Sequence, residues 1–187
     1  MKEKTDWQVV QATLDNIDNY KYIVEGYEQK LLAYIKRMLY INNQDAEDIL
    51  QEVFIKAYRN LNSYNPKYKF SNWIYRITHN EAVNFLRKNK NLRKNIPNNP
   101  NSDIFETLSS DIDIEKENID DSQKKEVLSA ISKLDKKYKD VLILKYLEEK
   151  DYNEISEILH IPSGTVGSLI SRGKIKLKNL LEKHGKD

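Results

Sequence analysis

The segment from Asp151 to Leu177, DYNEISEILHIPSGTVGSLISRGKIKL, carries side chains suited to contacts with nucleic acid. Its apolar spacing predicts two short helices joined by a tight turn. With about 100° of rotation per residue, the second helix separates into two faces. One face comprises Val166, Ile170, Gly173, Leu177 and Leu181, and the other comprises Thr165, Ser168, Leu169, Arg172 and Lys176. The first face can pack into a core while the second enters the major groove, as a helix-turn-helix requires.

A second candidate surface lies on a predicted helix at 46–61, for which Asp45 is the expected cap. The apolar face of this helix comprises Ala46, Ile49, Leu50, Val53 and Ala57, and the opposite face comprises Asp48, Gln51, Glu52, Ile55 and Arg59. Isolated exposed apolar residues are common, which is one interpretation of Ile55. The other is a partner surface in which acids flank an apolar anchor, suited to a basic protein.

A third helix is expected to follow the loop NSYNPKYKF, with Ser71 as its cap. Its apolar stripe comprises Phe70, Trp73, Ile74 and Ile77, but Asn80 and Asn84 occupy positions where leucine would continue the stripe. The asparagines either mark a kink and bond to the backbone, or form a polar pocket for an unstacked base. In the second case Tyr75 could stack on the base. Arg76, Arg87 and Lys88 would then hold phosphates, although a solvated basic face is the competing explanation.

Helical periodicity dominates the 187 residues, which include only five glycines and four prolines. We therefore expect an all-α protein of two small helical domains joined by an acidic flexible linker. The expected parts are a helical N-terminal extension at 1–19, a first domain at 20–94, the linker at 95–121 and a helix-turn-helix domain at 122–187. The net charge of +2 is nearly balanced, but basic runs at 87–94 and 172–178 flank the acidic linker. This segregation is typical of two DNA-facing modules.

Several classes of protein are poorly supported by the composition. The chain has no cysteine, which excludes disulfides and thiolate zinc sites. No apolar run is long enough to span a membrane, so we expect a cytoplasmic protein without membrane insertion. The three histidines are scattered, and neither an HExxH motif nor a glycine-rich phosphate loop occurs. We therefore expect no catalytic residue, no metal and no cofactor.

The motifs together resemble a known family. DAEDILQEVFIKAYRNL, FSNWIYRITHNEAVNFLRK and the helix-turn-helix segment resemble bacterial RNA polymerase sigma factors of the extracytoplasmic-function (ECF) type, in the family's order and spacing over about residues 22–182. The resemblance implies region 2 at 20–94, region 4 at 122–187, and a function in promoter recognition and transcription initiation. It also implies three partners: core RNA polymerase, promoter DNA and a membrane-linked anti-sigma factor. The contacts with polymerase would be made at its clamp helices and its flap.

The resemblance assigns three groups of site residues. The expected polymerase-binding residues are Asp48, Gln51, Glu52, Phe54 and Ile55. The expected minus-ten residues are Lys69, Tyr75, Arg76, Asn80, Asn84, Arg87 and Lys88. The expected minus-thirty-five residues are Ser163, Thr165, Ser168, Leu169, Arg172 and Lys176. The linker would thread toward the polymerase active site; in the free protein it either folds back on a basic run or remains a solvated tether.

Four positions depart from the family pattern. His160 stands where a turn glycine is usual, and a left-handed conformation there is possible for histidine but less favourable. Gly167 and Leu169 replace frequent basic residues, and Gly167 costs up to about 1 kcal/mol of helix propensity. Leu169 could touch a thymine methyl group, which predicts a T-containing duplex element bound with modest affinity. Asn84 replaces a frequent aspartate.

The alternative function is a free-standing helix-turn-helix regulator whose N-terminal helices dimerise or sense a ligand. Such a protein would bind paired duplex half-sites by itself. It would not account for the acidic face around Ile55 or for the second basic, aromatic segment.

Overall fold

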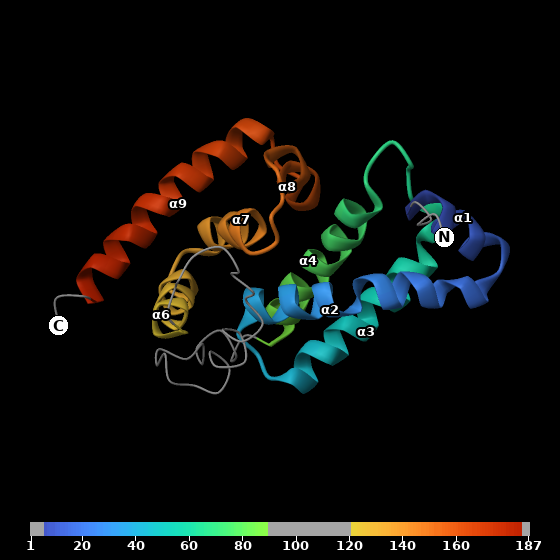
Figure 1. The fold of residues 1–187 in the computed structure, drawn as a ribbon, viewed down its shortest axis with the longest axis horizontal. Coiled ribbons are helices and arrows are strands. Elements are labelled where there is room, and N and C mark those ends of the chain that lie inside the picture. Colours follow the sequence, from blue (N-terminus) through green and yellow to red (C-terminus); the bar gives the residue numbers. More distant parts are fainter. Residues whose placement is uncertain (1–5, 90–120, 185–187) are drawn as a thin grey trace.

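The computed structural model describes residues 6–89 and 121–184, and over these residues the chain is helical without strands (Figure 1). The helices are α1 (Asp6–Asp15), α2 (Tyr20–Leu39), α3 (Asn43–Arg59), α4 (Phe70–Lys88), α6 (Asp121–Ser132), α7 (Lys136–Tyr146), α8 (Tyr152–Leu159) and α9 (Ser163–His184), with 3-10 turns η1 (Ile17–Asn19) and η2 (Leu61–Ser63). The all-α prediction is confirmed. The predicted linker at 95–121 lies outside the described residues apart from Asp121, with which α6 begins.

The first half is a bundle in which α2, α3 and α4 pack against one another and α1 lies on α2. Its core includes Leu31, Tyr34, Ile35, Val53, Ala57, Phe70 and Ile74, all nearly or fully inaccessible to solvent. The buried side of α3 is the one that the periodicity predicts: Ala46, Ile49, Leu50, Val53 and Ala57. The spacing of apolar residues is therefore sufficient to orient α3.

Three predicted helix ends were wrong because of local side-chain and backbone bonds. Asn42, rather than Asp45, caps α3, because its side chain accepts a bond from the Asp45 amide at 2.8 Å. Ser71 does not cap α4, which begins at Phe70 after Lys69. The helix predicted over 1–19 ends at Asp15, because the Asn16 side chain accepts from the Asp18 amide and starts η1 instead.

The second half consists of α6, α7 and α8 against the long helix α9, which contacts all three. Of the predicted inward face of α9, Val166 and Ile170 are buried and Gly173 lies against α7. His160 ends α8 at φ 56°, in the left-handed conformation that is less favourable for histidine than for glycine. An Asp151–Glu154 capping box starts α8.

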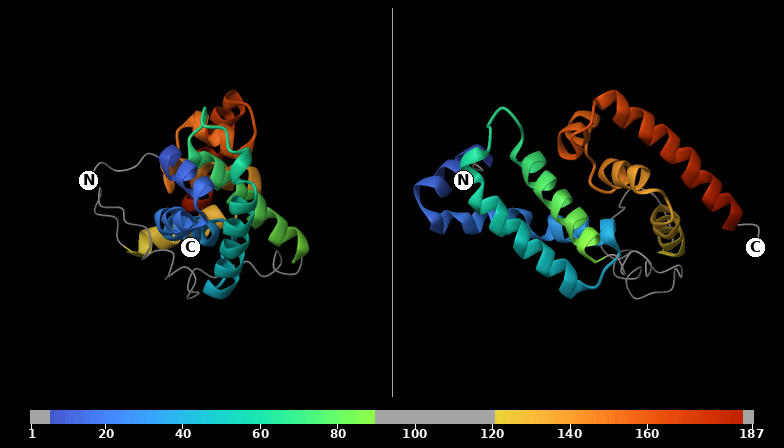
Figure 2. Two further views of the ribbon diagram at one scale, coloured as in Figure 1. Left: turned by 90° about the vertical axis from the view of Figure 1, so that its right-hand side faces the viewer. Right: turned by 180° about the vertical axis from the view of Figure 1, so that it is seen from behind.

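The two halves lie against each other, as the views from in front and behind show (Figures 1 and 2). Helix α8 packs along α4, and α7 contacts α2. Buried apolar residues of both halves form one continuous cluster. Among the described helices, none is long and apolar enough to cross a membrane.

Candidate nucleic-acid and polymerase interfaces

The outer face of α3 presents acids around an apolar side chain. Asp48, Gln51 and Glu52 are exposed, and Ile55 is 42% exposed between them and the C-terminal end of the helix. Phe54 is half-buried because the Tyr20 ring packs on it edge-on, with ring centroids 6.5 Å apart. The Tyr20 hydroxyl also donates to the Phe54 carbonyl at 2.6 Å. Ile55 is therefore a surface residue and not part of the core.

The residues predicted to contact the minus-ten element do not all face solvent. Arg76, Asn80, Arg87 and Lys88 are exposed. Asn84 is half-buried, donating to Glu81 Oε1 at 3.2 Å and accepting from Arg87 Nη2 at 3.3 Å. The asparagines therefore do not break α4, which continues to Lys88.

Tyr75 is buried, only 4% exposed, with its ring centroid 5.2 Å from that of Tyr34. Its hydroxyl donates to Glu148 Oε2 at 2.8 Å, and Lys150 Nζ lies 4.4 Å from the ring centroid on another side. Burial raises the pKa of the Tyr75 hydroxyl far above its usual value. In this arrangement the ring is not accessible to a base.

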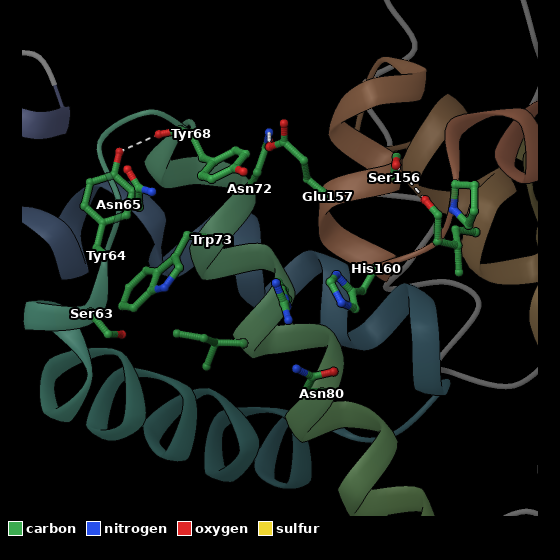
Figure 3. A pocket seen from close by; sticks show the side chains of 14 residues that line it. Ser63, Tyr64, Asn65, Tyr68, Asn72, Trp73, Asn80, Ser156, Glu157 and His160 are labelled. Carbon is green, nitrogen blue, oxygen red and sulfur yellow. Dashed lines mark hydrogen bonds between the residues drawn. The ribbon is translucent and has the colours of Figure 1, made fainter.

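A cavity of about 710 Å³ opens between α4, the loop before it and the turn after α8 (Figure 3). The lining combines aromatic rings, amides and one guanidinium: Ser63, Tyr64, Asn65, Tyr68, Asn72, Trp73, Arg76, Ile77 and Asn80 from the first half, with Ser156, Glu157, His160, Ile161 and Pro162 from the second. Aromatic faces can stack on a base while amides bond to its edge and Arg76 to a phosphate. The first half thus supplies the chemistry of a single-strand pocket.

Three carboxylates of the second half lie on the predicted minus-ten face. Glu154 pairs with Lys69 at 2.8 Å, Glu157 accepts from Asn72 Nδ2 at 2.7 Å (Figure 3), and Glu148 bonds to Tyr75. The hydrogen bond that Lys69 donates to Glu154 raises the pKa of Lys69. These acids come from α8 and the segment before it, and in this arrangement they pair with polar groups of α4 and of the loop before it.

A second polar contact between the halves surrounds His79. Its Nδ1 lies 3.1 Å from the Tyr34 hydroxyl, and Lys136 and Asp140 of α7 lie on the other side of the ring. Burial lowers the pKa of His79 to about 4, and Lys136 adds to this effect whereas Asp140 opposes it. His79 is therefore neutral at pH 7, and its 3.7 Å approach to Asp140 is not an ion pair there.

The outer face of α9 remains accessible. Ser163, Thr165, Ser168, Arg172 and Lys176 are exposed, whereas Leu169 is half-buried against the apolar cluster. Lys176 Nζ also lies 5.4 Å from the Tyr138 ring centroid. Thr165, Ser168, Arg172 and Lys176 therefore lie on one face of α9 with Leu169 at its border, whereas Ser163 begins the helix on another side.

Sequence reasoning missed the pocket residues of the loop and the acids that cover them. Tyr64, Asn65 and Tyr68 lie in the loop before α4, of which the predicted minus-ten set includes only Lys69. Its unusual density of aromatic residues beside Lys67 and Lys69 was the available signal. No periodic pattern marks Glu148 or Glu157, because their partners lie 73 and 85 residues away in the chain.

Within residues 6–89 and 121–184, no group of three or more acidic or histidine side chains is placed to hold a metal ion. The fold instead defines a two-part helical protein with one candidate single-strand pocket and one helix-turn-helix.

Comparisons with known proteins agree with this class. Residues 23–92 match the family model described as Sigma-70 region 2, and residues 124–177 match Sigma-70, region 4. The chain is 34% identical over 178 residues to the ECF RNA polymerase sigma factor SigW of Bacillus subtilis, a match that covers 93% of this chain and 95% of that protein.

Two solved structures share the fold. CnrH, solved in complex with the cytosolic domain of CnrY, has a TM-score of 0.68 and 21% identity, covering 94% of this chain and 95% of that chain. RpoE of Bartonella quintana, solved with the anti-sigma factor NepR, has a TM-score of 0.63 and 19% identity. The match covers 88% of this chain and 97% of that chain. The chain belongs to the ECF sigma factors of the sigma-70 family, and it directs promoter recognition and transcription initiation.

Proposed function

We propose that the exposed face of α3 binds core RNA polymerase at the clamp helices of its largest subunit. The observation that carries this assignment is the exposed Ile55 beside Asp48, Gln51 and Glu52. An apolar anchor among acids suits a basic partner surface, because burial of the side chain provides affinity and the charges orient the approach. Phe54, the preceding residue, belongs to the same proposed set and is held in place by Tyr20. We further propose that region 4 contacts the polymerase flap.

The minus-ten element is proposed to bind as a single strand on α4 and its preceding loop. Arg76 and Asn80 line the cavity beside Trp73, and Arg87 and Lys88 extend a basic surface along the helix. Capture of unpaired bases there would offset the free energy of unpairing. Lys69, Tyr75 and Asn84 complete the proposed set. Tyr75 becomes available only when the segment before α8 leaves α4, whereas Lys69 is exposed and need only release Glu154.

The minus-thirty-five element is proposed to bind as duplex to the exposed face of α9. Ser163 and Thr165 lie in its first turn, where the N-terminus of a helix favours a phosphate, and Arg172 and Lys176 follow along the side of Thr165. Leu169 would contact a thymine methyl group. We also propose the domain boundaries that go with these sites. They are an N-terminal extension at 1–19, region 2 at 20–94, a tether at 95–121 and region 4 at 122–187.

An anti-sigma factor is the further partner that we propose, because RpoE of Bartonella quintana was solved with one and CnrH with a segment of CnrY. The chain is proposed to act in the cytoplasm, where core polymerase is, and the anti-sigma factor to be membrane-linked.

The polymerase assignment is tested by pull-down with purified bacterial core RNA polymerase. We expect wild-type protein to bind and the Asp48→Lys/Ile55→Asp variant to lose binding while keeping its helicity. The matched control is Asp18→Lys/Ile17→Asp, which makes the same two changes at exposed positions of η1 and should bind normally. Binding of the first variant at wild-type strength would refute the assignment. Tight, dimeric duplex binding by the free protein without core binding would favour the free-standing regulator.

A further inference from the structure

The helix α1, for which the sequence suggested no role, is built into the first half. Val10 is 1% exposed and belongs to the apolar cluster, and Thr13 is also buried. At its first residue, Asp6 Oδ2 accepts a bond from the Tyr27 hydroxyl at 3.0 Å. Asp6 is bonded to α2 and Val10 and Thr13 are buried, so α1 has a defined place against α2 and η2.

From this position Trp7 reaches the loop that precedes α4. The Trp7 ring lies 6.2 Å from the Tyr64 ring, centroid to centroid, at 49°. Tyr64 in turn packs edge-on against Phe70 at 5.2 Å and lies 5.8 Å from Trp73. These separations are those of favourable aromatic pairs. The four rings form a continuous series from α1 to the first turn of α4.

Tyr64 also sets the shape of the loop. Its hydroxyl donates to the Tyr68 carbonyl at 2.7 Å, a bond that closes the loop across residues 64–68 (Figure 3). Inside it, the Asn65 side chain accepts from the Lys67 amide at 3.0 Å, and the Asn65 carbonyl accepts from the Tyr68 amide at 3.1 Å. Tyr64, Asn65 and Tyr68 form one wall of the cavity whose other wall includes Arg76 and Asn80.

We propose that Trp7 is a positioning residue for minus-ten capture, acting through Tyr64 on the loop 64–69. The inference rests on the proposed single-strand function of that loop and α4. A loop already held in its binding shape loses less conformational freedom when a base enters, so the strand binds more tightly. Trp7 is 40% exposed, so its ring covers Tyr64 from the surface and is not part of the buried core.

The test uses holoenzyme assembled from core polymerase and full-length chain. The probe is a fluorescein-labelled single strand carrying the minus-ten segment of a promoter that wild-type holoenzyme transcribes. We expect Trp7→Ala to weaken binding of this strand roughly two- to tenfold. Trp7→Phe, which keeps a ring against Tyr64, should restore it to within about twofold. Leu14→Ala is the matched control, because Leu14 is on the same helix and 41% exposed.

Amide hydrogen exchange reports the positioning directly. In Trp7→Ala the Lys67 and Tyr68 amides should exchange faster than in wild type and Leu14→Ala, because their bonds to Asn65 open more often. Tyr64→Phe, which removes only the bond to Tyr68, should weaken strand binding in the same direction. If Trp7→Ala itself fails to fold, normal strand binding by Tyr64→Phe overturns the proposal.

The proposal is also overturned if Trp7→Ala binds the single strand normally, or if Trp7→Phe binds it as weakly as Trp7→Ala does. An Asn80→Ala arm separates this failure from failure of the proposed function. If Asn80→Ala weakens binding and Trp7→Ala does not, the role of Trp7 alone is refuted. If neither variant changes binding, the strand binds elsewhere and both proposals fall.

Discussion

Arg37 of α2 and Glu148, 111 residues further along the chain, form a buried ion pair with 2.8 Å between Nη1 and Oε1. Their side chains are only 10% and 4% exposed, and the Glu148 carboxylate also accepts from the Tyr75 hydroxyl. Burial raises the pKa of Glu148, while Arg37 and Tyr75 oppose this shift. The pair joins the segment before α8 to α2, and the bond from Tyr75 joins the same carboxylate to α4, so Glu148 links the two halves.

Glu148→Gln should therefore favour separation of the halves. Removing one partner of a buried pair leaves the other charge uncompensated, which typically costs about 3–5 kcal/mol. We expect a larger radius of gyration by small-angle X-ray scattering and tighter binding of a single-stranded minus-ten oligonucleotide by the free chain. Glu149→Gln is the control, since Glu149 is the exposed neighbour. A Glu148→Gln protein as compact as wild type would show that the apolar contacts alone hold the halves together.

His79 should make the stability fall as the pH falls from about 6.5 toward 4. Its pKa is about 4 in the fold against 6.5 when unfolded, so the unfolded chain binds more protons in this interval. The contribution of neutral His79 to the free energy of unfolding is fully present above pH 6.5. By pH 4 it has fallen by about 3 kcal/mol at most. Glu148 contributes the opposite slope, because its pKa is raised and the folded state binds its proton more readily.

The His79 contribution is isolated as the difference between wild type and His79→Gln. We expect urea unfolding at pH 7.5, 6 and 5 to show a smaller acid-induced loss in His79→Gln, which cannot acquire a charge. His160→Gln, at an exposed histidine, should keep the wild-type slope. Parallel pH curves for wild type and His79→Gln would contradict the assignment.

Two glycines of α9 should respond to alanine in opposite directions. A Cβ at Gly173 would lie 3.2 Å from Leu142 Cδ1 and 3.4 Å from Tyr138 Cβ, within a buried contact. Crowding there outweighs the gain in helix propensity, so Gly173→Ala should lower the free energy of unfolding by about 1 kcal/mol. At Gly167 the Cβ would be 3.6 Å from the Tyr152 ring, an ordinary contact, and alanine should stabilise by up to about 1 kcal/mol.

Urea unfolding of the two alanine variants beside wild type checks this difference. If Gly173→Ala and Gly167→Ala raised the free energy of unfolding equally, Leu142 and Tyr138 would have moved aside without loss of stability. In that case α9 would not require glycine where it meets α7.

Leu169→Ala should reduce the preference of the free chain for thymine over uracil in its duplex site. Loss of one methyl contact corresponds to roughly a fourfold change in affinity. The measurement is fluorescence anisotropy with duplexes that differ only in thymine methyl groups, after circular dichroism has shown that the half-buried position tolerates alanine. A wild-type protein that already binds both duplexes equally would exclude the contact.

Much of the local structure was predictable because it depends on neighbours within one or two helical turns. The buried faces of α3 and α9 follow apolar spacing, and the left-handed His160 follows from the turn that must separate two short helices. Helix ends were less predictable, since Asn42 and Asp45 are both good caps and only the folded geometry chooses between them. Tyr75 shows the same limit: its type suits stacking on a base, but packing buries it against Tyr34.

The sequence by itself determined the helical elements, the faces they bury, the helix-turn-helix and the resemblance to ECF sigma factors. The tertiary structure alone decided that Glu148, Glu154 and Glu157 would meet α4 and the loop before it, and that Trp7 would meet Tyr64. The physical reason is the separation of the interacting residues along the chain. The periodicity of apolar residues indicates which side of a helix is buried, whereas contacts between residues 57 to 111 positions apart depend on how whole helices pack together.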